Sequence, residues 1–397
     1  MDPLVSIIIP VYNGSNYMRE ALDSALAQTY SNIEILVVND GSNDGGKTRD
    51  IAFSYGDRIR YLEQEKNGGV STVLNMGIRA MRGEYFSWLS HDDVYYPEKI
   101  QAEIDALRAA GNMDAVVYSG WDTLLMPERK VVPYEGLRRR YRDVYIHSGL
   151  CAEAFGFIGG GTLLIPRSWF DRYGLFDERL RGTQDDVKWF EMFHDKELVY
   201  VDEHLIQSRS HEMQVTYRYS GFQKECDELY LWMAKQVAEE DTQRAGLTLY
   251  QFLCGFLGAV GSFPTAREYV REKLQTMAPP KDAAERLQSF RSWLQSLGGT
   301  QHGIYLYCAG QRGEGCAAAL QGRGISIAGI ADSNSSKWGQ VIAGMTCLSP
   351  QELPNDALLI VTKIEAEGLR RQLRRDGFRH VVTYEEMEER LLMVPVI

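Results

Sequence analysis

The sequence predicts an α/β protein that has a mostly parallel sheet flanked by helices, a helical connector and a smaller C-terminal α/β domain. Short β-branched runs alternate with segments of helical periodicity over residues 5–93, and the same alternation restarts at Gly303. Between these segments, residues 219–297 show helical patterns that prolines interrupt. Strands that alternate with helices favour parallel sheets with right-handed crossovers. We therefore expect domains at residues 1–218, 219–300 and 301–397.

The expected strands of the first domain are short and rich in β-branched residues, as buried parallel strands are. They cover residues 5–11, 33–38, 59–62 and 84–89. Apolar residues at helical spacing between them predict a helix that starts near Met18 and another over residues 70–81. The C-terminal domain is expected to begin with a strand at 304–307, a glycine-rich turn and a helix. A second strand there covers 325–330 and leads to Asp332.

Composition narrows the class of protein. The 397 residues include 43 basic and 54 acidic side chains, which gives a net charge of −11 and argues against a nucleic-acid binder. Six scattered cysteines without a CxxC pair indicate a reducing compartment and argue against zinc. No run approaches the roughly 18 apolar residues of a membrane span, and the start of the chain lacks a secretory signal. We expect a cytoplasmic protein without a transmembrane segment.

Polar loops follow all four expected strands of the first domain. They contain Asn13-Gly14, residues 39–42, residues 67–69 and residues 91–93. In parallel sheets, ligands bind beyond the carboxyl ends of the strands, so these loops are expected to form one site.

Asp92 and Asp93 are adjacent carboxylates at a strand end, where their charges repel each other unless a cation is present. Mg²⁺ or Mn²⁺ would bind there with substrate phosphate oxygens as further ligands. The alternative is that the pair opens a loop or caps the helix that begins near Pro97.

The ordered motifs over roughly residues 3–220 resemble the family-2 glycosyltransferases, which have the GT-A fold. The resemblance is carried by the segments 10–13, 37–45, 67–69, 83–93, 161–162, 174–177, 183–187 and 209–214. Each motif alone is weak, and the set in this order is specific. One departure is Ser90, where the family often has a carboxylate, so which carboxylate touches the metal stays open.

The resemblance implies roles for individual residues. It assigns the nucleotide-sugar donor to Pro10, Tyr12, Asp40, Asn67, Gly68 and Asp92, the divalent metal to Asp92, Asp93 and His211, and general-base catalysis to Asp185. Structural alternatives remain: a packed aromatic for Tyr12, a plain turn at Asn67, a helix cap for Asp185 and a structural histidine at 211. The basic run at residues 138–142 is either an acceptor contact or a solvated loop.

The C-terminal domain resembles the Rossmann-like units of sugar-modifying enzymes, through residues 308–315, 329–334 and 344–350. Asp332 lies near the separation expected of a ribose-binding acid. Cys308 replaces the first glycine of the usual dinucleotide-binding fingerprint. Nucleotide binding and a role in assembly are both open.

The resemblance therefore implies a metal-dependent, inverting glycosyltransferase that uses a nucleotide-diphosphate sugar, with a UDP-sugar favoured. The acceptor would be a hydroxyl of a glycan or lipid-linked sugar in bacterial surface polysaccharide or glycan synthesis. A lipid-linked acceptor would be reached by peripheral attachment to the inner membrane or through a partner. The alternatives are a non-catalytic nucleotide-sugar sensor and a sugar nucleotidyltransferase. The donor sugar, the linkage and the oligomeric state are not determined by the sequence.

Overall fold

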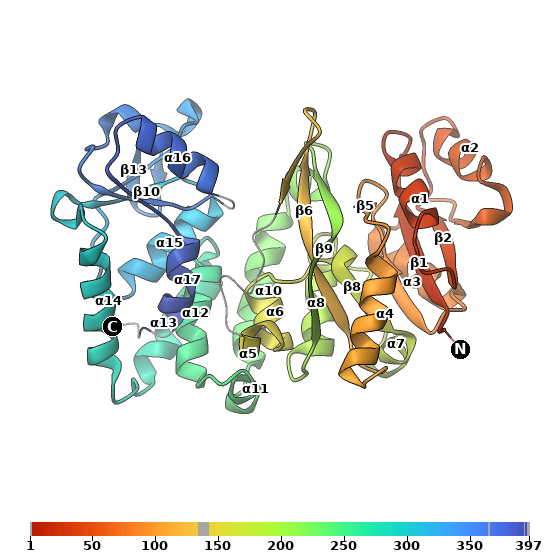
Figure 1. Cartoon of the computed structure of the whole chain (residues 1–397), viewed down its shortest axis with the longest axis horizontal. Coiled ribbons are helices and arrows are strands. Elements are labelled where there is room, and N and C mark those ends of the chain that lie inside the picture. Colours follow the sequence, from red (N-terminus) through yellow and green to blue (C-terminus); the bar gives the residue numbers. More distant parts are fainter. Residues whose placement is uncertain (1, 134–142, 364–365, 393, 395–397) are drawn as a thin grey trace. The chain divides into compact units, whose positions relative to one another are not determined.

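The computed structural model describes residues 2–133, 143–363, 366–392 and 394. The chain divides into two compact units, Met1–Glu225 and Cys226–Ile397, which are described separately below (Figure 1).

The first unit contains a nine-stranded sheet in the order β3-β2-β1-β4-β8-β6-β9-β5, with β7 paired to β6. Its strands are β1 (Val5–Val11), β2 (Ile33–Asn39), β3 (Arg60–Glu63), β4 (Tyr85–Trp88), β5 (Val94–Tyr95), β6 (Val117–Leu125), β7 (Lys130–Pro133), β8 (Leu163–Pro166) and β9 (Val199–Ser210). The first four strands pair in parallel, so their carboxyl ends lie at the same edge of the sheet. Antiparallel pairs of β8 with β4 and β6 extend the sheet beyond β4.

Helices pack on both faces of this sheet (Figure 1). The helices of this unit are α1 (Met18–Leu26), α2 (Lys47–Phe53), α3 (Val70–Ala80), α4 (Lys99–Ala110), α5 (Asp143–Ile146), α6 (Gly149–Ala154), α7 (Arg167–Tyr173), α8 (Gln184–Phe193) and α9 (Val215–Arg218). Ile7 and Ile9 of β1 share a core with α1 and α4, whereas Ile8 points the other way and faces Gly77 of α3. This alternation is the period of two expected of a strand, and both faces are buried.

The second unit begins within helix α10 (Phe222–Gln236) and continues with α11 (Glu239–Arg244), α12 (Leu249–Ala259), α13 (Pro264–Thr276) and α14 (Ala283–Ser296). Leu287, Phe290 and Leu294 of α14 share a hydrophobic core with the sheet that follows. Helix α12 packs closely on that domain as well, because a Cβ at Gly315 would lie 2.3 Å from the carbonyl oxygen of Gly258. The helices and the C-terminal sheet are therefore packed together.

The C-terminal sheet has six strands in the order β12-β13-β11-β10-β14-β15. Its elements are β10 (Ile304–Tyr307), α15 (Gln311–Gln321), β11 (Gly329–Ala331), β12 (Val341–Ile342), β13 (Met345–Leu348), β14 (Leu358–Val361), α16 (Glu367–Arg375), β15 (His380–Thr383) and α17 (Glu385–Leu392). All pairs except β12 with β13 are parallel. The chain moves outward from β10 to β13 and then returns to β14 on the other side of β10, as in Rossmann-like sheets.

The predicted α/β fold class is confirmed, with a large sheet flanked by helices and a smaller second sheet. The second strand of the C-terminal domain begins only at Gly329, four residues later than expected, because residues 325–328 approach the sheet as irregular chain. The domain boundaries at 218 and 300 stay a prediction. Among the described residues, no helix is long and apolar enough to span a membrane.

Candidate active site

The loops after β1 and β2 are joined by hydrogen bonds. The amide of Asn13 donates to Oγ of Ser42 at 2.8 Å, and the side chains of Asn13 and Asn43 exchange hydrogen bonds through Nδ2, Oδ1 and a backbone amide. Pro10 is buried within β1, whereas the ring of Tyr12 just beyond it is 40% exposed. The sequence places Tyr12 where the strand has ended, so its ring faces solvent and is available to stack on a ligand.

Asp40 organises the loop after β3. This buried carboxylate accepts hydrogen bonds from the amides of Gly68 at 2.7 Å and Gly69 at 2.9 Å, and also from Nε2 of Gln64. Gly69 has a φ of +95°, in the region that favours glycine. The structure thus brings Asp40 and Gly68 into direct contact, while Asn67 beside them is exposed.

Asp92 and His211 lie against each other although they are 119 residues apart in the chain. Oδ2 of Asp92 is 2.9 Å from Nε2 of His211, and the two side chains are only 14% and 10% exposed. The contact arises because β5 follows Asp93 directly and pairs antiparallel with β9, which leads to His211. Burial acts to raise the pKa of Asp92, but the bond to His211 and the nearby imidazoles outweigh it and lower that pKa.

Arg209 connects the Asp92–Asp93 loop to helix α1. Its buried guanidinium donates from Nε to the carbonyl oxygen of Asp92 and from a terminal nitrogen to Glu20 at 3.0 Å, and it lies 4.2 Å from the ring centre of Tyr17. The ring of Tyr17 also contacts His211, with centroids 5.2 Å apart. Arg209 and Tyr17 therefore hold the backbone and the imidazole of the site, and sequence reasoning missed this role for both.

Asp93 has different partners from Asp92. Its Oδ1 accepts the backbone amide of Arg209 at 2.8 Å. Burial and the neighbouring charge of Asp92 raise the pKa of Asp93 well above its ordinary value. Within the described residues, no group of three histidine, cysteine or acidic side chains is placed to hold a metal ion. Asp92 and His211 together present a carboxylate oxygen and an imidazole nitrogen, a donor pair that suits a divalent ion whose other ligands come from a substrate.

Asp185 lies in the first turn of α8. Burial raises the pKa of its carboxyl group to about 6. Burial and the charge of Asp185 raise the pKa of Asp186 well above its ordinary value. Burial and the charges of Asp186 and Asp185 likewise raise the pKa of Glu153 on α6 well above its ordinary value. Sequence reasoning missed Glu153, since a single glutamate in an apolar helix carries no signal of such neighbours.

The segment before α8 is tied to the loop after β3. Nη1 of Arg181 donates to the carbonyl oxygen of Gly68 at 2.8 Å, and Glu178 accepts a bond from Asn75 on α3 at 2.9 Å. These contacts hold the start of the Asp185 helix to the loop that Asp40 organises. Among the described residues, Asp185 makes no hydrogen bond to Asp92, Asp93 or His211. The basic run at 138–142 lies outside the described residues.

The geometry defines a class: an α/β protein that has polar loops at the carboxyl edge of a parallel sheet, with a partly buried aspartate–histidine pair at one of them. Comparison with known proteins gives its family. The family model of glycosyl transferase family 2 matches residues 6–174. An uncharacterized glycosyltransferase of Rickettsia prowazekii is 46% identical over 252 residues, which are 64% of this chain and 78% of that protein. The chain belongs to glycosyl transferase family 2.

Other relatives are longer. An uncharacterized glycosyltransferase of Rickettsia felis is 44% identical over 258 residues, which cover 63% of this chain and 41% of that protein. The chain thus spans less than half the length of some of the relatives it matches. Among solved structures, residues 1–349 of S. aureus TarS in complex with UDP-GlcNAc align over 81% of this chain and 92% of that one, with a TM-score of 0.51 and 16% identity. This likeness supports the GT-A-type fold.

Proposed function

We propose that this chain is a metal-dependent, inverting glycosyltransferase that moves a sugar from a nucleotide-diphosphate donor to a hydroxyl acceptor. The observation that carries the proposal is the 2.9 Å contact of Asp92 with His211 at the strand edge where the donor loops meet. The family membership of the chain supports the reaction type. The neighbour TarS was solved with UDP-GlcNAc, which makes a UDP-sugar the first donor to test.

We assign donor binding to the β1, β2 and β3 loops. The exposed ring of Tyr12 would stack on the nucleotide base, and Pro10 would shape the end of β1 beside it. Asp40 would either accept a hydrogen bond from the ring N–H of the base or hold in place the loop after β3, which would then contact the base. The amide groups of Gly68 and Gly69 already point to Asp40. Asn67 and Gly68 would let the backbone approach the ribose or the diphosphate closely.

Asp92 and His211 would hold a divalent ion, Mn²⁺ or Mg²⁺, together with the donor diphosphate. Asp93, the next residue in the chain, would be a further ligand of that ion. Such an ion neutralises the charge that develops on the leaving diphosphate. Arg209 would keep Asp92 in place through its backbone carbonyl. Ser90 leaves this loop one carboxylate short of the usual family pattern, which gives His211 more weight as a ligand.

Asp185 would act as the general base. It would take the proton of the acceptor hydroxyl as that oxygen bonds to the anomeric carbon and the bond from that carbon to the diphosphate oxygen breaks. The products are the glycosylated acceptor and the nucleoside diphosphate, and no covalent enzyme intermediate forms. A pKa of about 6 leaves the carboxyl group ionised at neutral pH, as a base must be.

The test is release of nucleoside diphosphate from UDP-, GDP- and dTDP-sugars with a panel of glycan acceptors, with Mn²⁺, Mg²⁺ or EDTA. We expect Asp185→Asn to lower turnover by roughly 10²- to 10⁴-fold while donor binding persists. Asp171→Asn on the exposed face of α7 is the matched control and should leave turnover unchanged. Donor binding without any turnover would favour a sensor, and pyrophosphate release would favour a nucleotidyltransferase; either result would overturn the proposal.

A further inference from the structure

A pocket of about 250 Å³ lies at the carboxyl ends of β10, β11 and β14 in the second unit. Its lining includes Cys308 and Gly310 after β10, Asp332 after β11, and Thr362 and Lys363 after β14. The chain leaves β10 toward β11 on one side and returns to β14 on the other. Open α/β sheets bind ligands at such a switch point, outside the carboxyl ends of the strands.

Basic side chains outnumber acidic ones among the described residues that line the pocket. Arg312, Lys337 and Lys363 line it, against Asp332 alone. Arg312 is held by an ion pair with Glu385 at 2.6 Å. Lys363 is exposed, on the loop that follows β14. A cavity with this balance of charge favours an anion.

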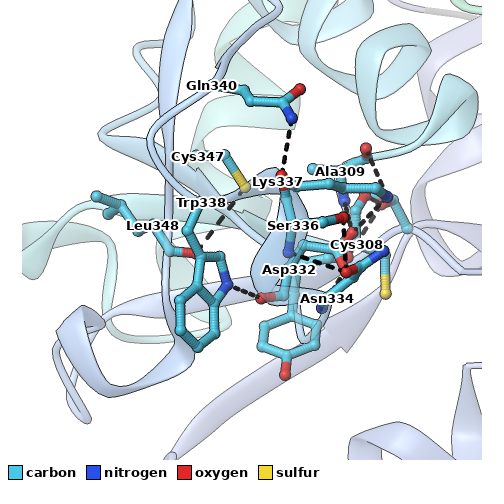
Figure 2. Close-up of polar contacts among 12 residues, drawn as sticks. Cys308, Ala309, Asp332, Asn334, Ser336, Lys337, Trp338, Gln340, Cys347 and Leu348 are labelled. Carbon is cyan, nitrogen blue, oxygen red and sulfur yellow. Dashed lines mark hydrogen bonds and ion pairs between the residues drawn. The ribbon is translucent and has the colours of Figure 1, made fainter.

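The carboxylate of Asp332 already accepts hydrogen bonds from neighbouring groups of the protein (Figure 2). Its Oδ2 accepts the amide of Ala309 and the ammonium of Lys337, both at 2.8 Å, and its Oδ1 accepts the amide of Asn334 at 2.8 Å. Lys337 also donates to the carbonyl oxygen of Ala309 at 3.0 Å. This carboxylate therefore fixes Lys337 at the pocket. Because its oxygens already bind these groups, a ribose hydroxyl would have to compete with them for the contact expected of an acid at this position.

The backbone adds further donors. Helix α15 begins at the pocket, and its N-cap residue Gly310 provides no side-chain cap for the first amides. A Cβ at Gly310 would meet nothing within 4 Å, so the space beside it is open. A Cβ at Gly313, by contrast, would lie 2.5 Å from the carbonyl oxygen of Cys308, so the helix start packs tightly on the preceding turn. Amides at a helix start, with the helix dipole behind them, bind phosphate groups.

We propose that this pocket binds the phosphate group of a small phosphate ester, held by the first amides of α15 with Lys337 and Lys363. Its volume of about 250 Å³ is below the roughly 300–1,000 Å³ of pockets that enclose whole drug-sized ligands. The pocket therefore suits a sugar phosphate or the phosphate end of a nucleotide, and the rest of a nucleotide would extend outside. Burial and Asp332 raise the pKa of the Cys308 thiol to about 11, so no thiolate repels the anion. This second site does not rest on the glycosyl transfer proposed above.

The test is calorimetric titration of the full chain in EDTA with inorganic phosphate, glucose 1-phosphate and UDP. Gly310→Asp places a carboxylate in the open space at the N-cap. Aspartate is a favourable N-cap residue, so the variant should fold. The added negative charge repels phosphate, so the probes should bind this pocket at least about tenfold more weakly. Gly310→Asn is the uncharged match and should keep most of the affinity. Lys363→Gln should weaken binding by about tenfold and Lys281→Gln, outside the pocket, should not.

The three probes distinguish the sources of the phosphate. Tighter binding of glucose 1-phosphate than of phosphate would identify a sugar phosphate. Tightest binding of UDP, in the part of the UDP binding that Gly310→Asp removes, would identify a nucleotide. Asp92→Ala should leave the affinities for inorganic phosphate and glucose 1-phosphate unchanged, because that residue lies in the other unit. The proposal is overturned if neither phosphate nor glucose 1-phosphate binds and no UDP binding is lost in Gly310→Asp, if the affinity for phosphate and glucose 1-phosphate survives Gly310→Asp, or if Asp92→Ala removes that affinity.

Discussion

Arg209 reaches the Asp92 loop from a strand 117 residues later in the sequence. It is 1% exposed and binds the carbonyl oxygen of Asp92, the carboxylate of Glu20 and the ring of Tyr17. A buried guanidinium is stable only when such partners compensate for its lost hydration. The same partners fix the position of the loop, so at this residue the stability of the fold and the geometry of the site depend on one side chain.

Arg209→Ala is expected to lower the free energy of unfolding by about 1–3 kcal/mol, because it leaves buried acceptors unpaired. Arg129→Ala is the control, since Arg129 also pairs with Glu20 but is 55% exposed, and exposed pairs contribute about 1 kcal/mol or less. Urea denaturation of both variants measures the difference. Equal losses in the two would show that the buried contacts of Arg209 contribute nothing of their own.

The raised pKa of Asp185 predicts how turnover depends on pH. A general base acts in its ionised form, so kcat/KM should fall as the pH decreases through about 6 and level off above it. The pH profile of nucleoside diphosphate release measures this limb. A flat profile between pH 5 and about 8 would speak against Asp185 as the base.

At the scale of the element, glycines set how closely helices and strands approach. A Cβ at Gly160 would lie 2.4 Å from the ring of Trp88, and one at Gly149 would lie 2.1 Å from the carbonyl oxygen of Phe193. Gly160 therefore lets the chain pass over β4, and a Cβ at Gly161 would lie 2.5 Å from Ile206 of β9. In the second unit, Gly315 serves the contact of α12 with α15 in the same way.

Gly315→Ala should destabilise the protein by about 1–3 kcal/mol, because the added methyl group meets the backbone of Gly258. Gly368→Ala on α16 is the matched change, since a Cβ there meets nothing within 4 Å. Its higher helix propensity should stabilise the protein by up to about 1 kcal/mol. Thermal unfolding of the pair gives the sign of each effect, and a stabilising Gly315→Ala would disprove the close helix contact.

Each of the two units has its own hydrophobic core and its own set of loops at the carboxyl edge of a sheet. Ligands that bind only the folded state raise its stability by about 2.7 kcal/mol at a hundred times their dissociation constant. Addition of ligands to the full chain can therefore show which unit binds which ligand.

We expect UDP to raise the melting temperature more with Mn²⁺ than with EDTA. His211→Gln should remove the Mn²⁺-dependent part. His204→Gln is the control, because His204 lies on β9, the strand that leads to His211, but bonds to Asp122 outside the donor loops. A rise that persists in His211→Gln and falls in His204→Gln would mean that the metal lies elsewhere.

The α/β class, the parallel sheet of the first strands and the loops that hold Asp40, Asp92 and Asp93 could be predicted from the sequence alone. These features are local, because the period of apolar residues and the polar turns after strands can be read along the chain. The clustering of Asp92 with His211 was predicted only through the family resemblance, and its geometry depends on the pairing of β5 with β9.

Three features depend on tertiary packing and could not be predicted: the partners of Arg209, the proximity of Glu153 to Asp185, and the contact of Arg181 with Gly68. The structure also showed that Asp332 bonds to Lys337 and to backbone amides. Each of these contacts joins residues whose types are common and whose separation in the chain follows no period. Such contacts depend on the packing of distant elements and leave no pattern in the sequence.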